Sequence, residues 1–284
     1  MPAKFIGAHM PTSGGLHKAI RRGKEIGCTA VQVFTSSPQT WHAKPITDEM
    51  VENLALALEE TGIDPSKTVS HDSYLINLCA PVEEKREQSI NGLKNELLRC
   101  SQLGIPFVVS HMGAHMSQGE DEGLAKVAEA ALWILDDTPD DVTILMETTA
   151  GQGSSLNYRF EHLAKILELT KSPERLCICL DTCHIFAAGY DIRTKETYEA
   201  TFAEFDRLIG CDRIKVIHSN DSKKAFGSRV DRHEHLGEGE IGPIAFQCLV
   251  KDPRFENTPI VVETPKAEEM HAENVRRLWE WANA

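Results

Sequence analysis

Residues 143–181, TILMETTAGQGSSLNYRFEHLAKILELTKSPERLCICLD, contain two short apolar runs with one longer amphipathic segment between them. The runs TILMET (143–148) and LCICLD (176–181) are rich in residues that favour strands. In YRFEHLAKILELT (158–170) the apolar residues recur at helical spacing. Strand, helix and strand in this order predict a βαβ unit, whose two strands run parallel in one sheet.

The same alternation extends along the chain in both directions. Among the helical segments, residues 46–62 have Thr47 as an N-cap and Gly62 as a stop, and residues 81–104 stop at Gly104. The eight expected strands are KFIGAH (4–9), AVQVF (30–34), TVSHD (68–72), FVVSH (107–111), TILMET (143–148), LCICLD (176–181), IKVIHS (214–219) and PIVVET (259–264). The expected helices lie within 15–27, 46–62, 81–104, 123–137, 158–170, 195–210, 242–250 and 266–282.

Eight strand–helix units in 284 residues predict an α/β fold, a closed (β/α)8 TIM barrel, because such barrels take roughly 250 residues. No Pro/Ser-rich or low-complexity linker interrupts the series, so we expect a single domain over residues 1–284. An open, doubly wound sheet is the structural alternative.

Composition limits the classes of function. No run of about 18 apolar residues occurs, and the first residues lack an apolar signal core, so we expect a cytoplasmic protein without membrane contact. Eight cysteines without a CxxC pair indicate reduced thiols. The net charge of −13 argues against a nucleic-acid partner unless bound metal supplies positive charge.

Potential metal ligands follow the strands of the predicted barrel. Chemistry in this fold takes place at the carboxyl ends of the strands, and six consecutive strands end in imidazoles or carboxylates. Their convergence on one rim would be strongly destabilising without cations. Mixed nitrogen and oxygen ligands favour zinc, with manganese or iron as alternatives, and six ligands suit two metals that share a carboxylate. The six residues are His71, His111, Glu147, Asp181, His218 and Glu263.

Two loops add a third group of candidates. His184 lies three residues after Asp181, in the turn beyond the sixth strand. In DRHEHLGEGE (231–240), Asp231 and His233 are two positions apart, which places both side chains on one side of an extended segment. His184, Asp231 and His233 would leave a fourth coordination position open, as in catalytic zinc sites, and His235 is an alternative to His233.

Four other polar residues receive supporting roles. His115 follows His111 at helical spacing, but HMGAH contains a glycine and begins at a strand end, so His115 is expected to support a ligand or to be structural. His9 faces the same rim, although the metals have enough ligands without it. Asp221 and Asp191 are expected to orient ligand imidazoles.

These motifs resemble the endonuclease IV family of abasic-site DNA repair enzymes. The resemblance covers essentially the whole chain, in family order, and its longest motif is highly specific. It rests on IGAHMPTSGGL (6–16), HDSYLINL (71–78), ETTAGQG (147–153), LDTCHIFAAGYD (180–191), HSNDSKKAFGSRVDRHEHLGEG (218–239) and VVET (261–264).

The resemblance implies a TIM barrel with three zinc ions. One zinc would be bound by His71, His111 and Glu147. Glu147 would bridge to a second zinc, which Asp181, His218 and Glu263 also bind. The third zinc would be bound by His184, Asp231 and His233. Three Zn²⁺ outweigh the four ligand carboxylates, so the pocket would be locally positive and would attract a phosphate.

The implied reaction is hydrolysis of the phosphodiester 5′ to an abasic site in duplex DNA, which leaves a 3′-hydroxyl and a 5′-deoxyribose phosphate. The family also trims blocked 3′ ends. A metal-bridging hydroxide would attack the phosphorus. Glu147 would bind both of the metals that this hydroxide bridges. Glu263 would also orient the attacking water or hydroxide.

Abasic recognition requires side chains that fill the gap in the base stack. The resemblance assigns this role to Tyr74, Leu75 and the loop SSPQTW (36–41), where Gln39 replaces an arginine of some members. Arg229 is expected to contact flanking phosphates, as are Lys223, Lys224 and Arg232. A monomer suits an enzyme that lays one face along a duplex.

Two other functions fit parts of this pattern. A xylose-isomerase-like sugar isomerase or epimerase shares the rim histidines and carboxylates, but does not need His184 or the Asp231–His233 pair. A zinc-storing or scaffold protein is disfavoured because closed structural sites are typically rich in cysteine ligands, and this set contains none.

Overall fold

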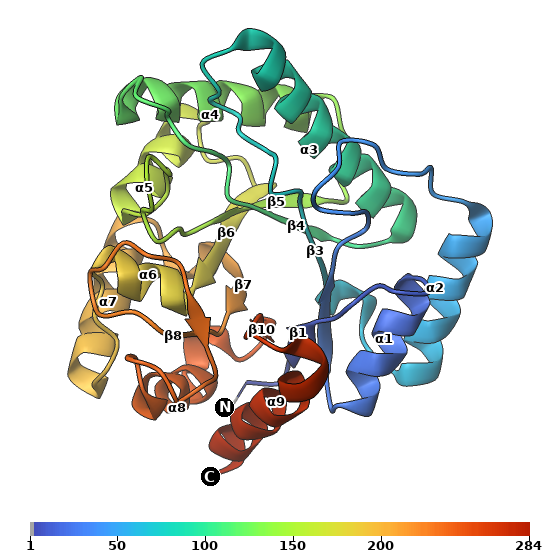
Figure 1. Cartoon of the computed structure of the whole chain (residues 1–284), viewed down its shortest axis with the longest axis vertical. Helices are drawn as coiled ribbons and strands as arrows, with labels where there is room; N and C mark the ends of the chain where they lie inside the picture. Colours follow the sequence, from blue (N-terminus) through green and yellow to red (C-terminus); the bar gives the residue numbers. More distant parts are fainter. Residues whose placement is uncertain (1–2) are drawn as a thin grey trace.

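The computed structural model describes residues 3–284, whose parallel strands close into a barrel with helices around it (Figure 1). This confirms the predicted TIM barrel and excludes the open sheet. The order around the barrel is β1-β10-β7-β6-β5-β4-β3-β2, so β10 closes the barrel against β1. The barrel strands are β1 (Ile6–His9), β2 (Ala30–Val33), β3 (Thr68–His71), β4 (Phe107–Ser110), β5 (Thr143–Glu147), β6 (Leu176–Asp181), β7 (Ile214–His218) and β10 (Ile260–Val262).

Helices follow the strands on the outside of the barrel (Figure 1). Eight of them correspond to the expected segments. They are α1 (Leu16–Glu25), α2 (Asp48–Thr61), α3 (Glu83–Leu103), α4 (Glu120–Asp136), α5 (Phe160–Leu169), α7 (Lys195–Leu208), α8 (Pro243–Lys251) and α9 (Ala267–Asn283). Three short 3-10 turns precede strands, at Pro65–Lys67, Cys211–Arg213 and Pro253–Phe255.

Local sequence signals fix the ends of α2 and α3. The Thr47 side chain accepts a hydrogen bond from the Met50 amide, as expected of an N-cap. Gly62 and Gly104 end the two helices in the left-handed conformation, with φ of 67° and 69°. Glycine adopts this conformation without steric cost, so both predicted stops are confirmed.

Two elements were not expected from the sequence. Residues Thr182–Ala188 form a short helix, α6, where a turn was predicted. Asp221–Ser222 (β8) and His233–Glu234 (β9) pair antiparallel as a small ribbon outside the barrel. Both elements lie beyond the carboxyl ends of β6 and β7, on the face where candidate ligands were predicted.

The apolar core has two parts. A small cluster fills the inside of the barrel, and it includes Val69, Leu145 and the pair Cys177 and Cys179, which are two positions apart in β6. A larger cluster lies between the strands and the helices. Gly7 allows β1 and β2 to approach, because a Cβ there would lie 1.7 Å from the Ala30 carbonyl oxygen. Within residues 3–284, no helix is long and apolar enough to cross a membrane.

Candidate metal centre at the carboxyl end of the barrel

The structure brings all nine predicted ligands together on one rim. His71, Glu147, Asp181 and His218 are the last residues of their strands, and His111 and Glu263 directly follow β4 and β10. Because parallel strands end at the same side of the barrel, their terminal side chains converge. Three groups are made up of predicted ligands alone, and the first two of them share Glu147. Within each group the possible ligand atoms all lie within 4.8 Å of one another.

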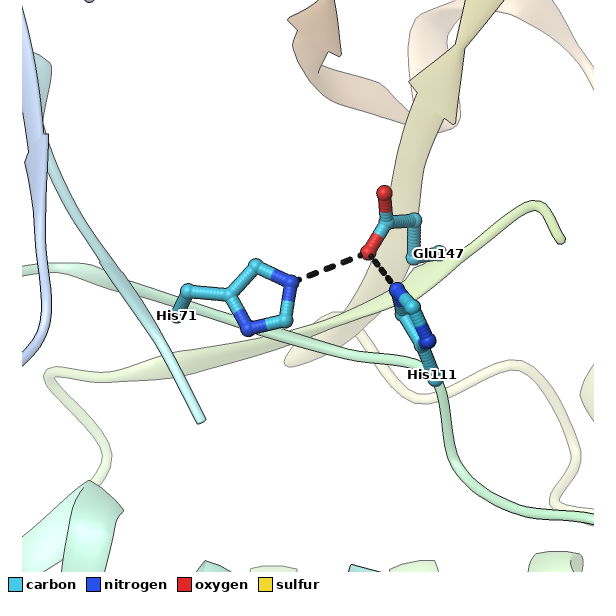
Figure 2. A group of neighbouring side chains, drawn as sticks. All are labelled: His71, His111 and Glu147. Carbon is cyan, nitrogen blue, oxygen red and sulfur yellow. Dashed lines mark hydrogen bonds and ion pairs between the residues drawn. The ribbon is translucent and has the colours of Figure 1, made fainter. Parts of the chain in front are cut away.

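The first group joins β3, β4 and β5. The Nε2 atoms of His71 and His111 both face the same oxygen of Glu147, Oε2, at 3.1 and 2.8 Å (Figure 2). Glu147 is fully buried, whereas the His111 side chain is 42% exposed. The group is therefore open on the His111 side.

The second group shares Glu147 with the first. Nδ1 of His218 lies 2.9 Å from Glu147 Oε1 and 3.1 Å from Glu263 Oε2. Asp181 completes the group, with Oδ2 at 3.9 Å from the same nitrogen. Since its two oxygens face different groups, Glu147 is placed to bridge two ions.

The third group depends on the two unexpected elements. Asp181 caps α6 by accepting a hydrogen bond from the His184 amide, so α6 directs the His184 imidazole back toward the rim. The β8–β9 ribbon carries His233. Nε2 of His184 lies 3.2 Å from Asp231 Oδ2, and Nε2 of His233 lies 3.2 Å from Asp231 Oδ1. His235 is not part of this group, because it is buried beside Asn274 and contacts that amide instead.

Opposite charges compensate one another within these groups. Burial alone would lower the pKa of His71, but the hydrogen bond and charge of Glu147 outweigh it and raise the pKa to about 10. In the same way, burial is outweighed at His233 by Asp181 and Asp231, which raise its pKa to about 9. Burial would raise the pKa of Glu147, yet the surrounding imidazoles hold it well below its usual range. Positive charge beside Glu147 and Asp231 therefore stabilises these buried carboxylates, and bound metal ions would do the same.

The residues fit divalent metal ions such as zinc. Nε2 of His184 and Nε2 of His233 are buried and make no hydrogen bond within residues 3–284, although each faces an Asp231 oxygen. Unpartnered buried nitrogens are costly, and a cation between them and the carboxylate would satisfy both. Five imidazoles and four carboxylates form a donor set that suits zinc better than magnesium or calcium, which prefer oxygen alone.

The supporting residues differ from expectation in two cases. Asp221 orients no imidazole; its carboxylate accepts hydrogen bonds from the amides of Ser222, Gly237, Gly239 and Ile241. It thereby fixes the loop that follows β9. The Asp191 carboxylate likewise accepts its hydrogen bonds from Arg193, through the side chain and the backbone amide of that residue.

The two remaining histidines lie close to the positions inferred for them. His115 accepts a hydrogen bond from the Gly119 amide, which is a structural contact in the loop after β4. Nδ1 of His9 lies 3.0 Å from Glu263 Oε1, and His9 belongs to none of the three groups.

Two polar residues of the site were missed by sequence reasoning. Gln32 in β2 contacts both His218 and Glu263. Asn220 donates to Asp181 Oδ2 and accepts from the Glu263 amide. Gln32 is the one polar residue in the run AVQVF, and that isolation was the available signal.

A cavity of about 380 Å³ is lined by residues of all three groups and by Tyr74, one of the candidate DNA-contacting residues. Tyr74 and Leu75 are 63% and 37% exposed. The Tyr74 amide and the Ser73 hydroxyl both donate to the Pro38 carbonyl, so the Tyr74 loop and the Gln39 loop are joined. The guanidinium of Arg229 lies over the Tyr158 ring, 4.5 Å from its centroid.

Known proteins with similar sequences cover nearly the whole chain. Residues 20–281 match the family described as xylose isomerase-like TIM barrel. The probable endonuclease 4 of Chloroflexus aggregans is 53% identical over 93% of this chain and 92% of its own length. The probable endonuclease 4 of Geobacter sulfurreducens is 45% identical over 96% of this chain and 94% of its own.

A solved structure agrees with these relatives. The crystal structure of endonuclease IV from Thermus thermophilus matches with a TM-score of 0.87 and 34% sequence identity, and the match covers 99% of both chains. With its barrel, rim motifs and full-length relatives in agreement, the chain belongs to the endonuclease IV family of xylose isomerase-like TIM barrels.

Proposed function

We propose that this protein hydrolyses the phosphodiester bond 5′ to abasic sites in duplex DNA and also removes blocking groups from 3′ ends. As a member of the endonuclease IV family, it is a DNA-cleaving hydrolase. The convergence of three potential metal-binding groups on one cavity, beside exposed Tyr74 and Leu75, is the observation that carries the proposal.

The nine rim residues would hold three divalent metals, which we propose are zinc. His71, His111 and Glu147 would hold one, and Glu147, Asp181, His218 and Glu263 a second. His184, Asp231 and His233 would hold the third. Bound divalent metals lower the pKa of water and neutralise charge on phosphate oxygens, which is the chemistry that phosphodiester hydrolysis needs.

Glu263 orients the attacking water. Burial would raise its pKa, but His218 and the hydrogen bond from His9 lower it well below the usual range, so this carboxylate stays ionised. An ionised carboxylate that is this weak a base accepts a hydrogen bond from water rather than removing its proton. Glu263 also lines the cavity, so its carboxylate can reach a bound substrate.

Duplex recognition uses the two loops that carry Tyr74 and Gln39, together with basic residues near the rim. Tyr74 and Leu75 fill the gap left by the abasic nucleotide, and Gln39 lies on the neighbouring loop. Gln39 is exposed, but it lacks the charge of an arginine, so its contribution is contact rather than ion pairing. Arg229, Lys223, Lys224 and Arg232 would contact flanking phosphates.

An incision assay tests the function directly. Purified, zinc-replete protein should cut a duplex at a tetrahydrofuran analogue of an abasic site, and Glu147→Gln should lower the rate by about 10³ or more, since it removes the shared carboxylate. Circular dichroism should show that Glu147→Gln retains its fold. An uncut duplex would refute the proposal, and turnover of a ketose would support the sugar isomerase instead.

A further inference from the structure

Three of the rim histidines are oriented by backbone carbonyl groups. Nδ1 of His71 lies 3.0 Å from the Asp72 carbonyl, and Nδ1 of His184 lies 2.8 Å from that of Thr148. Nδ1 of His233 lies 3.2 Å from the Glu263 carbonyl. A carbonyl only accepts hydrogen bonds, so Nδ1 carries the hydrogen and Nε2 faces the carboxylates in all three.

His218 has the opposite orientation. Its Nδ1 faces Glu147 and Glu263, and its Nε2 points away from the group. Nε2 lies 2.7 Å from the side-chain oxygen of Gln32, Oε1. A side chain therefore selects which nitrogen of His218 faces the group. In His71, His184 and His233 a backbone carbonyl makes this selection.

The second end of the Gln32 amide contacts Glu263. Its Nε2 donates to Glu263 Oε1 at 2.6 Å, and the His9 imidazole lies 3.0 Å from the same oxygen. Glu263 Oε2 is then left facing His218 Nδ1. A reversed Gln32 amide would place two acceptor oxygens together at Glu263, so the carboxylate fixes which end of the amide faces His218.

Gln32 is fully buried in β2, between apolar neighbours. A buried amide is costly unless its donors and acceptor are used. This one uses its oxygen on His218 and its nitrogen on Glu263, two candidate ligands of one group, and the nitrogen also lies 3.0 Å from His9 Nδ1. We propose that Gln32 is a positioning residue, which sets the nitrogen of His218 and the oxygen of Glu263 that face the metal. This inference rests on the proposed function, because it assigns a role within the metal centre of that enzyme.

The substitution Gln32→Leu tests the inference, because leucine has a similar size and no hydrogen-bonding atoms. Zinc at the Glu147–Asp181–His218–Glu263 group should be removed by a competing chelator about 10- to 100-fold more readily than in the wild type. Zinc at the His184–Asp231–His233 group should be retained. In ¹⁵N-histidine NMR spectra of the zinc-loaded protein, His218 should lose the signal of a hydrogen-bonded Nε2–H.

The variant Gln32→Glu separates the two contacts of the amide. It keeps an acceptor for His218 but removes the donor to Glu263, so the His218 signal should be preserved while zinc retention still falls. The control Gln118→Leu removes a partly buried amide that bonds the Cys79 and His115 carbonyls on the same rim. It should leave both the zinc retention and the His218 signal unchanged.

Unchanged zinc retention and an unchanged His218 signal in Gln32→Leu would overturn the inference. Equal weakening of zinc in Gln32→Leu and Gln118→Leu would also overturn it, because the effect would then be general loosening. These measurements are independent of incision. A wild-type protein that binds zinc without cutting DNA would refute the proposed function and leave the orientation of His218 established.

Discussion

Glu147 is the residue on which the site is centred. Its two oxygens lie within 3.5 Å of nitrogens from His71, His111, His184 and His218, and the carboxylate is fully buried. A buried carboxylate is tolerated only where positive charge compensates it. The imidazoles around Glu147 face it as hydrogen-bonding partners, and bound metal ions would supply the positive charge. The site is thus a charge-balanced cluster rather than a set of separate ligands.

Removal of the His184 imidazole should remove one metal. His184 belongs to the third group alone, so His184→Ala should lower the zinc content from about three to about two per chain. Elemental analysis after gel filtration measures this change. The control His115→Ala removes a histidine that only bonds the loop backbone and should keep the full content. An unchanged zinc content in His184→Ala would mean that the third group binds no metal.

Among the elements, helix α3 fixes the loop that carries Gln39. Arg99 donates hydrogen bonds to the Thr35 carbonyl at 2.6 Å and to the Lys44 carbonyl at 2.5 Å, one at each side of this loop. Glu96, from the same helix, accepts bonds from the hydroxyls of Thr35 and Ser70. Because the loop also contacts the Tyr74 loop, α3 supports both segments expected to enter the duplex.

Arg99→Met should weaken DNA recognition without affecting metal binding. The variant loses the hydrogen bonds from Arg99 to the Thr35 and Lys44 carbonyls, and each buried hydrogen bond is worth about 1 kcal/mol. The KM for abasic duplex should therefore rise about tenfold or more, while the zinc content stays unchanged. Steady-state kinetics and elemental analysis measure the two effects.

A matched control separates recognition from stability. Arg175 is also a largely buried arginine that bonds backbone carbonyls, those of Val142 and Leu135, but it precedes β6 at the amino end of the barrel. Arg175→Met should lower thermal stability to a similar extent and leave KM unchanged. Equal effects of both substitutions on KM would contradict a specific role for Arg99.

At the scale of the whole molecule, this acidic protein has to bind DNA, which is itself negatively charged. The net charge is −13, so attraction to DNA has to come from the local field at the rim rather than from the total charge. The exposed Lys223 and Lys224 directly follow β8, on the side of the barrel where the three groups converge. Such cations release counterions from DNA, which makes binding depend on salt.

The double substitution Lys223→Gln and Lys224→Gln should reduce this salt dependence. In a Glu147→Gln background, which prevents cleavage, the slope of log Kobs against log salt should become shallower by about 0.9 for each phosphate that the protein no longer neutralises. Fluorescence anisotropy with an abasic duplex measures it. The control Lys171→Gln with Lys251→Gln changes the net charge by the same amount. Lys171 lies just after α5 and Lys251 is the last residue of α8, both on the opposite side of the barrel, so the slope should not change. Equal slopes in all variants would exclude Lys223 and Lys224 from phosphate binding.

The order of strands and helices, the barrel and the strand-end positions of the rim ligands all follow from the sequence alone. These features depend on local periodicity, on capping and on the shared direction of parallel strands, which can be read within short segments. Asp231 and His233 were placed on one side of an extended segment by the same reasoning.

The association of these residues depends instead on tertiary structure. The tertiary structure places His233 rather than His235 in the third group. It also directs Asp221 toward a loop backbone and brings Gln32 into contact with His218 and Glu263. Gln32 is 186 positions from His218 and 231 from Glu263, and barrel closure through β1 and β10 brings the three together. No local pattern encodes such contacts, because they depend on the register of strands that are distant in the chain.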